Sequence, residues 1–222
     1  MNNSYKWAMY LNFFVFAILL NSVGIVILKS INNYGVTELQ ASTLELFKDM
    51  PVAIVSFLFA SFIPKIGYKK TMLIGLTLVL VGLAQMYLGN SFSSAQILFA
   101  IVGGTFGLIK VSVYGSIGHI AEGEKAHNSI LSTVEGIFMF GVASAYFLFP
   151  AFNTEGLPNA WLNVYVLLGA MVVLAILFLI RIPELPKAQG KVNLIEEFKP
   201  MLGLITKLLV IVFVFSAFLY VM

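Results

Sequence analysis

Residues 95–118 read AQILFAIVGGTFGLIKVSVYGSIG, an apolar stretch that is interrupted by a single charged side chain, Lys110. A hydrocarbon core about 30 Å thick is crossed by ~20 mostly apolar helical residues. Five further stretches of this kind, and a last one that continues to the final residue, lie at 6–28, 43–63, 71–89, 128–149, 161–181 and 203–222. The sequence therefore predicts an all-α membrane protein, with a bundle of six transmembrane helices and the start of a seventh.

The composition supports this prediction and excludes several classes of protein. Hydrophobic residues make up 60% of the chain and charged residues 10%, and the mean hydropathy is +0.97. The absence of cysteine excludes disulfides, thiolate metal sites and cysteine nucleophiles. The net charge of +3 is small and scattered, so no nucleic-acid partner is predicted. The first apolar run is too long for a cleaved signal peptide, and no small-residue cleavage site follows it.

Basic residues gather on one side of the predicted membrane. If the N-terminus is cytoplasmic, the loops and helix ends on that side hold Lys6, Lys65, Lys69, Lys70, Lys125, Arg181, Lys187, Lys191 and Lys199. The other side keeps Lys29, with Lys48 near the outer end of the second run. Because basic residues are retained on the cytoplasmic side, the N-terminus is predicted to be cytoplasmic.

The chain divides into three predicted parts. Residues 1–181 form the six-helix bundle, and 182–202 form a cytoplasmic linker that contains KVNLIEEFKP. In the linker, Asn193 and Glu196 have the spacing of a capping box, which predicts a short amphipathic helix on the membrane surface. Residues 203–222 are the first helix of a second bundle, and an end inside an apolar run predicts a truncated chain.

This plan resembles the major facilitator superfamily, whose two six-helix halves each contain a 3+3 inverted repeat. In that superfamily the third and sixth helices face lipid, while the first and fourth line the cavity. The polar residues of this chain agree with that assignment. The third run has little beyond Thr77 and Gln85, and the sixth has only Asn163 and Tyr165.

The loop 64–70, PKIGYKK, carries a second resemblance. The superfamily signature between helices two and three runs Gly-x-x-x-Asp-Arg/Lys-x-Gly-Arg-Arg/Lys, and it is matched here by Lys65, Gly67 and Lys69. The chain departs from it at Ala60, Pro64 and Tyr68. The form P-x-x-G-Y-K-K is similar to that of fucose-type sugar:proton symporters. The resemblance implies a gating loop at the three matching residues, without the carboxylate that latches the two halves in relatives.

Two ionisable residues lie deep in predicted spans, where insertion costs ~2.5–3.5 kcal/mol and function is the default hypothesis. Lys110 lies roughly 12 Å and Glu135 roughly 10 Å from the cytoplasmic end of their helices, so we expect them to be able to contact each other. In one interpretation Lys110 and Tyr114 bind substrate and Glu135 takes the coupling proton. In the other, the two charges form a structural ion pair. Gly103 and Gly107 extend the Lys110 stripe and leave room for a neighbouring helix or a ligand.

The second run opens with TLELFKDMP, in which Glu45 and Asp49 share one face beside Lys48. This cluster is interpreted either as a solvated helix start or as an outward-facing proton site in which Asp49 matters most. In the first run, Asn12 and Asn21 are half a turn out of phase and point in opposite directions. Asn21, in the outer half, is the better candidate for a substrate-binding residue.

These features predict a secondary active transporter of a small polar solute, with a sugar as first choice and an organic anion as second. It is expected to work by proton symport and alternating access in a plasma membrane, such as the bacterial inner membrane, together with the missing C-terminal half. The alternatives are an efflux antiporter of the same fold and a non-transporting scaffold or half-size subunit. No enzyme chemistry and no cofactor is predicted, and His119 and His127 are too few for a metal site.

Overall fold

The computed structural model describes residues 2–153, 157, 159–187, 203 and 212. The chain divides into two compact units, Met1–Lys187 and Ala188–Met222, and everything below concerns the first. The predicted surface helix in the linker and the predicted seventh span fall outside the described residues, apart from Gly203 and Val212.

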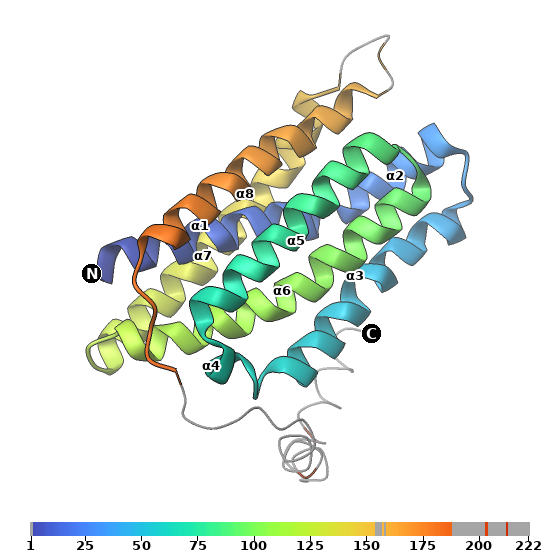
Figure 1. Ribbon diagram of the computed structural model, residues 1–222. Coiled ribbons are helices and arrows are strands. Elements are labelled where there is room, and N and C mark those ends of the chain that lie inside the picture. The colour runs from blue at the N-terminus through green and yellow to red at the C-terminus, as the bar shows by residue number, and fades with distance from the viewer. Residues whose placement is uncertain (1, 154–156, 158, 188–202, 204–211, 213–222) are drawn as a thin grey trace. The chain divides into compact units, whose positions relative to one another are not determined.

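The first unit is built from helices, so the prediction of an all-α protein is confirmed for the part of the chain that the structure describes (Figure 1). They are α1 (Asn2–Asn21), α2 (Val23–Tyr34), α3 (Glu38–Phe59), α4 (Ile63–Ile66), α5 (Tyr68–Gly89), α6 (Phe92–Ile120), α7 (Glu124–Ala151), the short 3-10 helix η1 (Ala160–Leu162) and α8 (Asn163–Arg181). Local signals fix several boundaries. Thr37 and Gln40 form a capping box at the start of α3, and Ser91 accepts a hydrogen bond from the Ser94 amide at the start of α6.

Among the described residues, five helical stretches are long and apolar enough to cross a membrane: Ser4–Tyr34, Tyr68–Gly89, Phe92–Ile120, Glu124–Ala151 and Ala160–Arg181. They indicate a membrane protein. The second predicted run corresponds to α3, which has 22 residues but is less apolar because Glu45, Lys48 and Asp49 lie in its middle. The first run corresponds to α1 and α2 together, and the others to α5, α6, α7 and α8.

The long helices pack in two layers. In the four-helix layer, α3 lies along α6, α6 contacts α1, and α1 lies along α7. The two-helix layer consists of α5 and α8, which contact each other, with α5 packed on α6 and α8 on α1. The charged residues in the middle of long helices all belong to the four-helix layer: Glu45, Lys48, Asp49, Lys110 and Glu135. The third and sixth predicted runs, which contain few polar residues and correspond to α5 and α8, thus form a separate layer.

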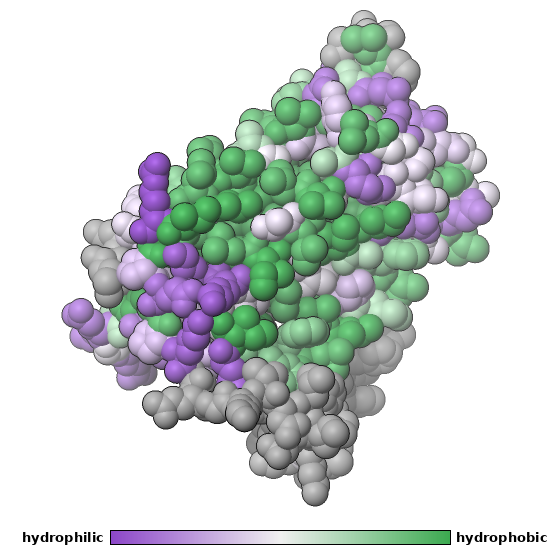
Figure 2. All heavy atoms as spheres, in the orientation of Figure 1, coloured by the Kyte–Doolittle hydropathy of each residue, from purple (hydrophilic) through white to green (hydrophobic). Residues whose placement is uncertain are grey.

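Hydrophilic side chains gather at both ends of the bundle, and Figure 2 shows a wide hydrophobic band between them. One end, called the basic end here, holds the start of α1, the loops before α5 and α7, and the end of α8. Its described basic residues are Lys6, Lys65, Lys69, Lys70, Lys125, Arg181 and Lys187. At the opposite end, Lys29 donates a hydrogen bond to Asn153 at 2.8 Å.

Two glycines of α6 let α3 approach closely. A Cβ atom at Gly103 would overlap the backbone carbonyl of Lys48, and one at Gly107 would lie 2.8 Å from Ser56 Oγ and 3.1 Å from Val52 O. This is the packing that small residues four apart permit between membrane helices. The sequence predicted that either a helix or a ligand would fill the space beside these glycines, and in the structure α3 fills it.

Candidate functional site

The predicted functional residues fall in three separate places in the structure. One place lies where α1 meets α2, the second lies between α6 and α7, and the third lies at the basic end. The first place contains Asn21 and, facing it on α3, Asp49. The second contains Lys110, Tyr114 and Glu135. The third contains Lys65, Gly67 and Lys69.

A pocket with a volume of ≈ 480 Å³ opens between α1, α2, α3 and α7. We call it the kink pocket, and its lining residues are Asn21, Val23, Gly24, Ile25, Leu28, Glu45, Lys48 and Tyr146. It therefore combines an amide, a phenol, a carboxylate and an ammonium with apolar walls. A small number of polar groups in an apolar pocket is the usual composition of a small-molecule site.

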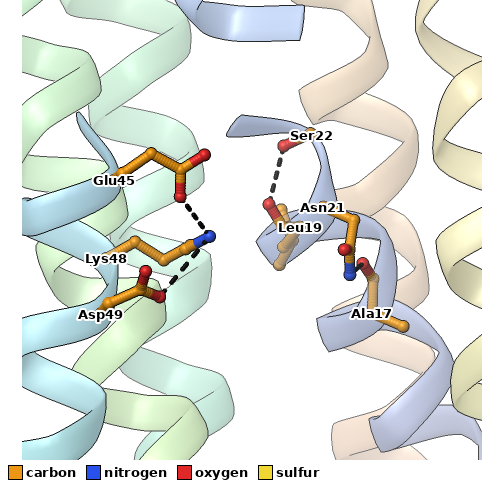
Figure 3. A network of polar contacts seen from close by, with 7 residues as sticks. All are labelled: Ala17, Leu19, Asn21, Ser22, Glu45, Lys48 and Asp49. Carbon is orange, nitrogen blue, oxygen red and sulfur yellow. Dashed lines mark hydrogen bonds and ion pairs between the residues drawn. The ribbon is translucent and has the colours of Figure 1, made fainter. Parts of the chain in front are cut away.

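The pocket lies beside Ser22, the single residue between α1 and α2, where the helical backbone hydrogen bonds continue. Asn21 Nδ2 donates to the carbonyl of Ala17 at 2.9 Å, and Ser22 Oγ donates to that of Leu19 at 2.7 Å (Figure 3). Side chains that bond back to the preceding turn compete with the helix backbone and bend it. The Asn21 amide keeps its second Nδ2–H as a donor and Oδ1 as an acceptor for a ligand.

Lys48 is the centre of the charged group on the α3 wall of the kink pocket. Its Nζ lies 2.6 Å from Glu45 Oε2 and 3.5 Å from Asp49 Oδ1 (Figure 3). Its side chain is 15% exposed, whereas those of Glu45 and Asp49 are 46% and 68% exposed. The ammonium is thus compensated by two carboxylates, and the group as a whole carries one negative charge.

This charged group lies deeper than the start of a helix. The capping box at Thr37 makes α3 begin at Glu38, five residues before the predicted span. Lys48 is therefore ten residues, or ~15 Å, from the start of its helix. Its backbone packs against Gly103, which lies at a similar distance from the start of α6. The charged group therefore lies in the middle of α3 rather than at its first turn.

Tyr114 stands between the two deep charges of the second place. Its hydroxyl donates a hydrogen bond to the Glu135 carboxylate, and Lys110 Nζ lies 5.8 Å from the centre of its ring. Among the residues that the structure describes, no ion pair joins Lys110 to Glu135. The expected contact is thus replaced by Tyr114, which lies one turn along α6 and fills the space toward α7. We call these three residues the Tyr114 bridge.

An aromatic layer separates the kink pocket from the Tyr114 bridge. Phe13 of α1, Phe106 of α6 and Phe138 of α7 contact one another, with ring centres 5.7 to 6.0 Å apart. Phe106 lies about one turn from both Gly103 and Lys110, which are ~10 Å apart along α6. Sequence reasoning missed this layer, because its rings come from three helices far apart in the chain.

The third place, the loop before α5, holds the chain just after α8. Lys69 Nζ donates to the carbonyls of Ile180 at 3.0 Å and Ile182 at 2.6 Å, where the carbonyls of an ending helix lack partners. Gly67 has a left-handed φ of 106°, and a Cβ atom there would lie 2.7 Å from Lys187 Cε. Two of the three predicted gating residues therefore contact the segment after α8.

Ion pairs surround this contact. Glu184 lies 3.1 Å from Lys187 and 4.0 Å from Lys70. The hydrogen bond from Lys187, together with the nearby Lys70 and Lys69, holds the pKa of the Glu184 carboxyl below its ordinary value. We refer to the contacts of Lys69, Lys70 and Gly67 with 180–187 as the basic-end clamp.

Two further observations complete the description of the site. In the described ranges, no group of three or more His, Cys, Asp or Glu side chains is arranged to hold a metal ion. No family model matches the chain, and no curated protein matches it.

Proposed function

We propose that the protein is a secondary active transporter that binds a small polar solute in the kink pocket. The observation that carries this proposal is a pocket of ≈ 480 Å³ in which charged side chains of α3 face polar and apolar side chains of two long apolar helical stretches, Ser4–Tyr34 and Glu124–Ala151. Ionisable residues are costly in a membrane and mark solute or ion paths.

A sugar is the solute that this pocket suits best. Lys48 is compensated by Glu45 and Asp49, so the pocket offers donors and acceptors without excess positive charge. Asn21 and Tyr146 add an amide and a hydroxyl. Such a set suits a hydroxyl-rich neutral molecule, and the resemblance of the loop 64–70 to sugar:proton symporters points to the same class.

A specific observation favours an organic anion as the second candidate. Lys110 is exposed on α6 and, in the described part of the chain, has no carboxylate within ion-pair distance. Tyr114 engages Glu135 instead. A cation left in this position suits the carboxylate or phosphate of a solute.

Proton coupling is proposed at Glu135 and Asp49. Each is a carboxylate held by a specific partner, Tyr114 in the first case and Lys48 in the second. Protonation removes the charge that these contacts stabilise and so changes the contacts. The two carboxylates lie on opposite sides of the aromatic layer, as alternate exposure to the two sides of a membrane requires.

The packing supports a 3+3 repeat of the major facilitator type. Let α1 with α2, α3 and α5 form the first three spans, and α6, α7 and α8 the last three. In such a repeat α1 corresponds to α6, α3 to α7 and α5 to α8. The α1–α7 contact then corresponds to the α6–α3 contact, the α1–α8 contact to the α6–α5 contact, and the α5–α8 contact to itself. Each of these contacts is present. In this arrangement the four-helix layer faces the cavity, and the second half of the transporter covers it.

The test is uptake by proteoliposomes that contain the protein purified from its native membrane. We expect labelled monosaccharide to enter faster when the pH outside is lower than inside, and Asn21→Leu to abolish this uptake. Thr77→Val is the matched control, because Thr77 is exposed on α5, away from the kink pocket, and its hydroxyl donates to the Leu73 carbonyl of its own helix. Uptake of dicarboxylates alone would select the second candidate, and uptake of neither class would contradict the proposal.

A further inference from the structure

We infer that an anionic phospholipid binds in a groove between α7 and α8, with its phosphate at Lys29 and one acyl chain along the groove. The groove has a volume of ≈ 560 Å³, and its lining comes from α1, α7 and α8. Because α1 contacts both of the other helices, it forms the floor, and α7 and α8 form the walls. We call this the α7–α8 groove. It shares no lining residue with the kink pocket.

The lining of the α7–α8 groove suits a hydrocarbon chain. Phe147 and Phe140 of α7 are 79% and 67% exposed, while Ile18 of α1 is almost completely buried at the floor. Among the described lining residues only Ser144 is polar, and its hydroxyl donates to the Phe140 carbonyl of its own helix at 2.8 Å. A contiguous exposed apolar surface of this kind marks a site of interaction, and here it lies within the hydrophobic band of the bundle.

The length of the groove matches one leaflet of a membrane. It follows α7 from Ala151, the last residue of the helix, back to Phe140, which is eleven residues or ~16 Å away. Half of the hydrocarbon core is ~15 Å thick. At the inner end the rings of Phe14 and Phe140 stack, with their centres 5.7 Å apart. An acyl chain that enters beside Ala151 therefore ends against these rings, near the middle of the membrane.

A lysine at the mouth of the groove favours an anionic headgroup. Asn153 follows Ala151 by two residues, at most ~7 Å along the chain, and its amide donates to the Pro150 carbonyl at 2.9 Å. Lys29 Nζ donates to Asn153 Oδ1 at 2.8 Å, which holds the ammonium at this end of α7. Two of its three hydrogens remain for a phosphate. In the described part of the chain, no carboxylate lies within ion-pair distance of Lys29.

The position of the groove gives the lipid a structural role. The helix α7 belongs to the four-helix layer and α8 to the two-helix layer, so an acyl chain between them fills a seam between the layers. The phosphate at Lys29 joins the end of α2 to the end of α7 at the same time. The lipid thus packs as part of the bundle, whereas ordinary boundary lipid covers any apolar helix face without regard to its headgroup.

The test is photocrosslinking of the full chain in phosphatidylcholine nanodiscs. Two probes carry a diazirine near the end of the same acyl chain, one on phosphatidylglycerol and one on phosphatidylcholine. We expect the first to label 140–151 about fivefold more, the factor that one lysine contributes near an anionic lipid. The reference is the stretch 78–88 of α5, which lies in the same leaflet and contains no charged residue, and it should take both probes equally. Equal labelling of 140–151 by both probes would overturn the inference.

Two pairs of variants test the headgroup and the acyl chain separately. Lys29→Gln should remove the preference for phosphatidylglycerol, whereas Lys125→Gln, at an exposed lysine of the basic end, should keep it. Ala143→Trp places a large ring in the groove and should lower labelling of 140–151 by the phosphatidylglycerol probe severalfold. Ala84→Trp should not, because Ala84 lines a separate apolar pocket of ≈ 280 Å³ between α5 and α8. A preference that survives Lys29→Gln would contradict the assignment.

Other occupants of the groove give a different result. If a second copy or another segment of the chain covers it, neither probe labels 140–151 while 78–88 is still labelled, and the inference fails. Crosslinking requires no transport. A negative result therefore leaves the transporter proposal standing, and failed uptake leaves the lipid site standing.

Discussion

At the scale of single residues, the site depends on two side chains, Lys48 and Tyr114, each of which lies between two charged groups. Lys48 separates Glu45 from Asp49, whose carboxylates would otherwise face each other without compensation on one side of α3. Tyr114 keeps Lys110 from Glu135 and bonds to the carboxylate itself. Both side chains are therefore positioned to control how a neighbouring charge responds to a ligand or a proton.

Replacing Lys48 should destabilise the protein. In Lys48→Met, the carboxylates of Glu45 and Asp49 lose the ammonium between them. Because both carboxylates are more than a third exposed to solvent, we expect a loss of about 0.2–1 kcal/mol in unfolding free energy. Thermal unfolding in detergent measures it, with the exposed Lys125→Met as control. Equal melting temperatures for the two variants would show that Lys48 is not held as described.

Tyr114→Phe isolates the hydroxyl of the bridge. The ring beneath Lys110 is retained, and only the hydrogen bond to Glu135 is lost, so we expect a loss of about 1–2 kcal/mol in unfolding free energy. Tyr87→Phe, at a partly exposed tyrosine of α5, should change little. If the lost hydrogen bond is the cause, Tyr114→Phe should lower the unfolding free energy no further when Glu135 is already replaced by leucine. Fully additive losses in the double variant would contradict the bond.

At the scale of elements, close packing of α3 on α6 depends on Gly103. Gly103→Ala places a methyl group against the Lys48 carbonyl and should cost about 1–3 kcal/mol, the range for overpacked sites. Gly118→Ala, on the same helix with no atom within 4 Å of the new methyl, should be neutral or stabilising by up to about 1 kcal/mol. Unfolding midpoints of the two variants test this, and similar values would exclude the close approach.

The basic-end clamp should depend on pH in a defined direction. The pKa of Glu184 is lowered in the folded chain, so its stabilising contribution is complete above the ordinary carboxyl range. It is lost as the pH falls through the lowered value, below about pH 4. Hydrogen exchange of the amides of 182–187, corrected for the intrinsic rate, should therefore rise only in acid.

The matched variant for this experiment is Lys69→Met. The lysine donates to backbone carbonyls, which do not titrate in this range, so its loss should raise exchange in 182–187 at every pH. Glu184→Gln should instead raise exchange at neutral pH and remove most of the acid effect. Acid-dependent exchange that survives in Glu184→Gln would assign the effect to another group.

At the scale of the whole molecule, the apolar runs predicted the helices well because length and hydropathy are local properties. They also indicated that α5 and α8 would be least polar, and these two helices form their own layer. Three features were out of reach. The boundary between α1 and α2 at Ser22 depends on side chains bonding back to the helix, and the depth of Lys48 depends on the cap at Thr37. The position of Tyr114 between two charges depends on how α6 and α7 face each other.

The proposed cavity can be tested over the whole four-helix layer because the chain lacks cysteine. Met139 of α7 shares a helix face with Tyr146 of the kink pocket, whereas Phe147 lines an apolar groove shared with α8. We expect a water-soluble maleimide to label Met139→Cys quickly and Phe147→Cys slowly in intact membranes. The reverse order would place lipid, rather than water, against the four-helix layer.

The aromatic layer has a further consequence, for the response of the protein to membrane voltage. The rings at Phe13, Phe106 and Phe138 lie between the charges of the kink pocket and those of the Tyr114 bridge. An elementary charge that crosses the membrane gains or loses about 2.3 kcal/mol per 100 mV. If the proposed symport moves one proton past these rings with each neutral solute, every cycle carries one net charge and should generate a current.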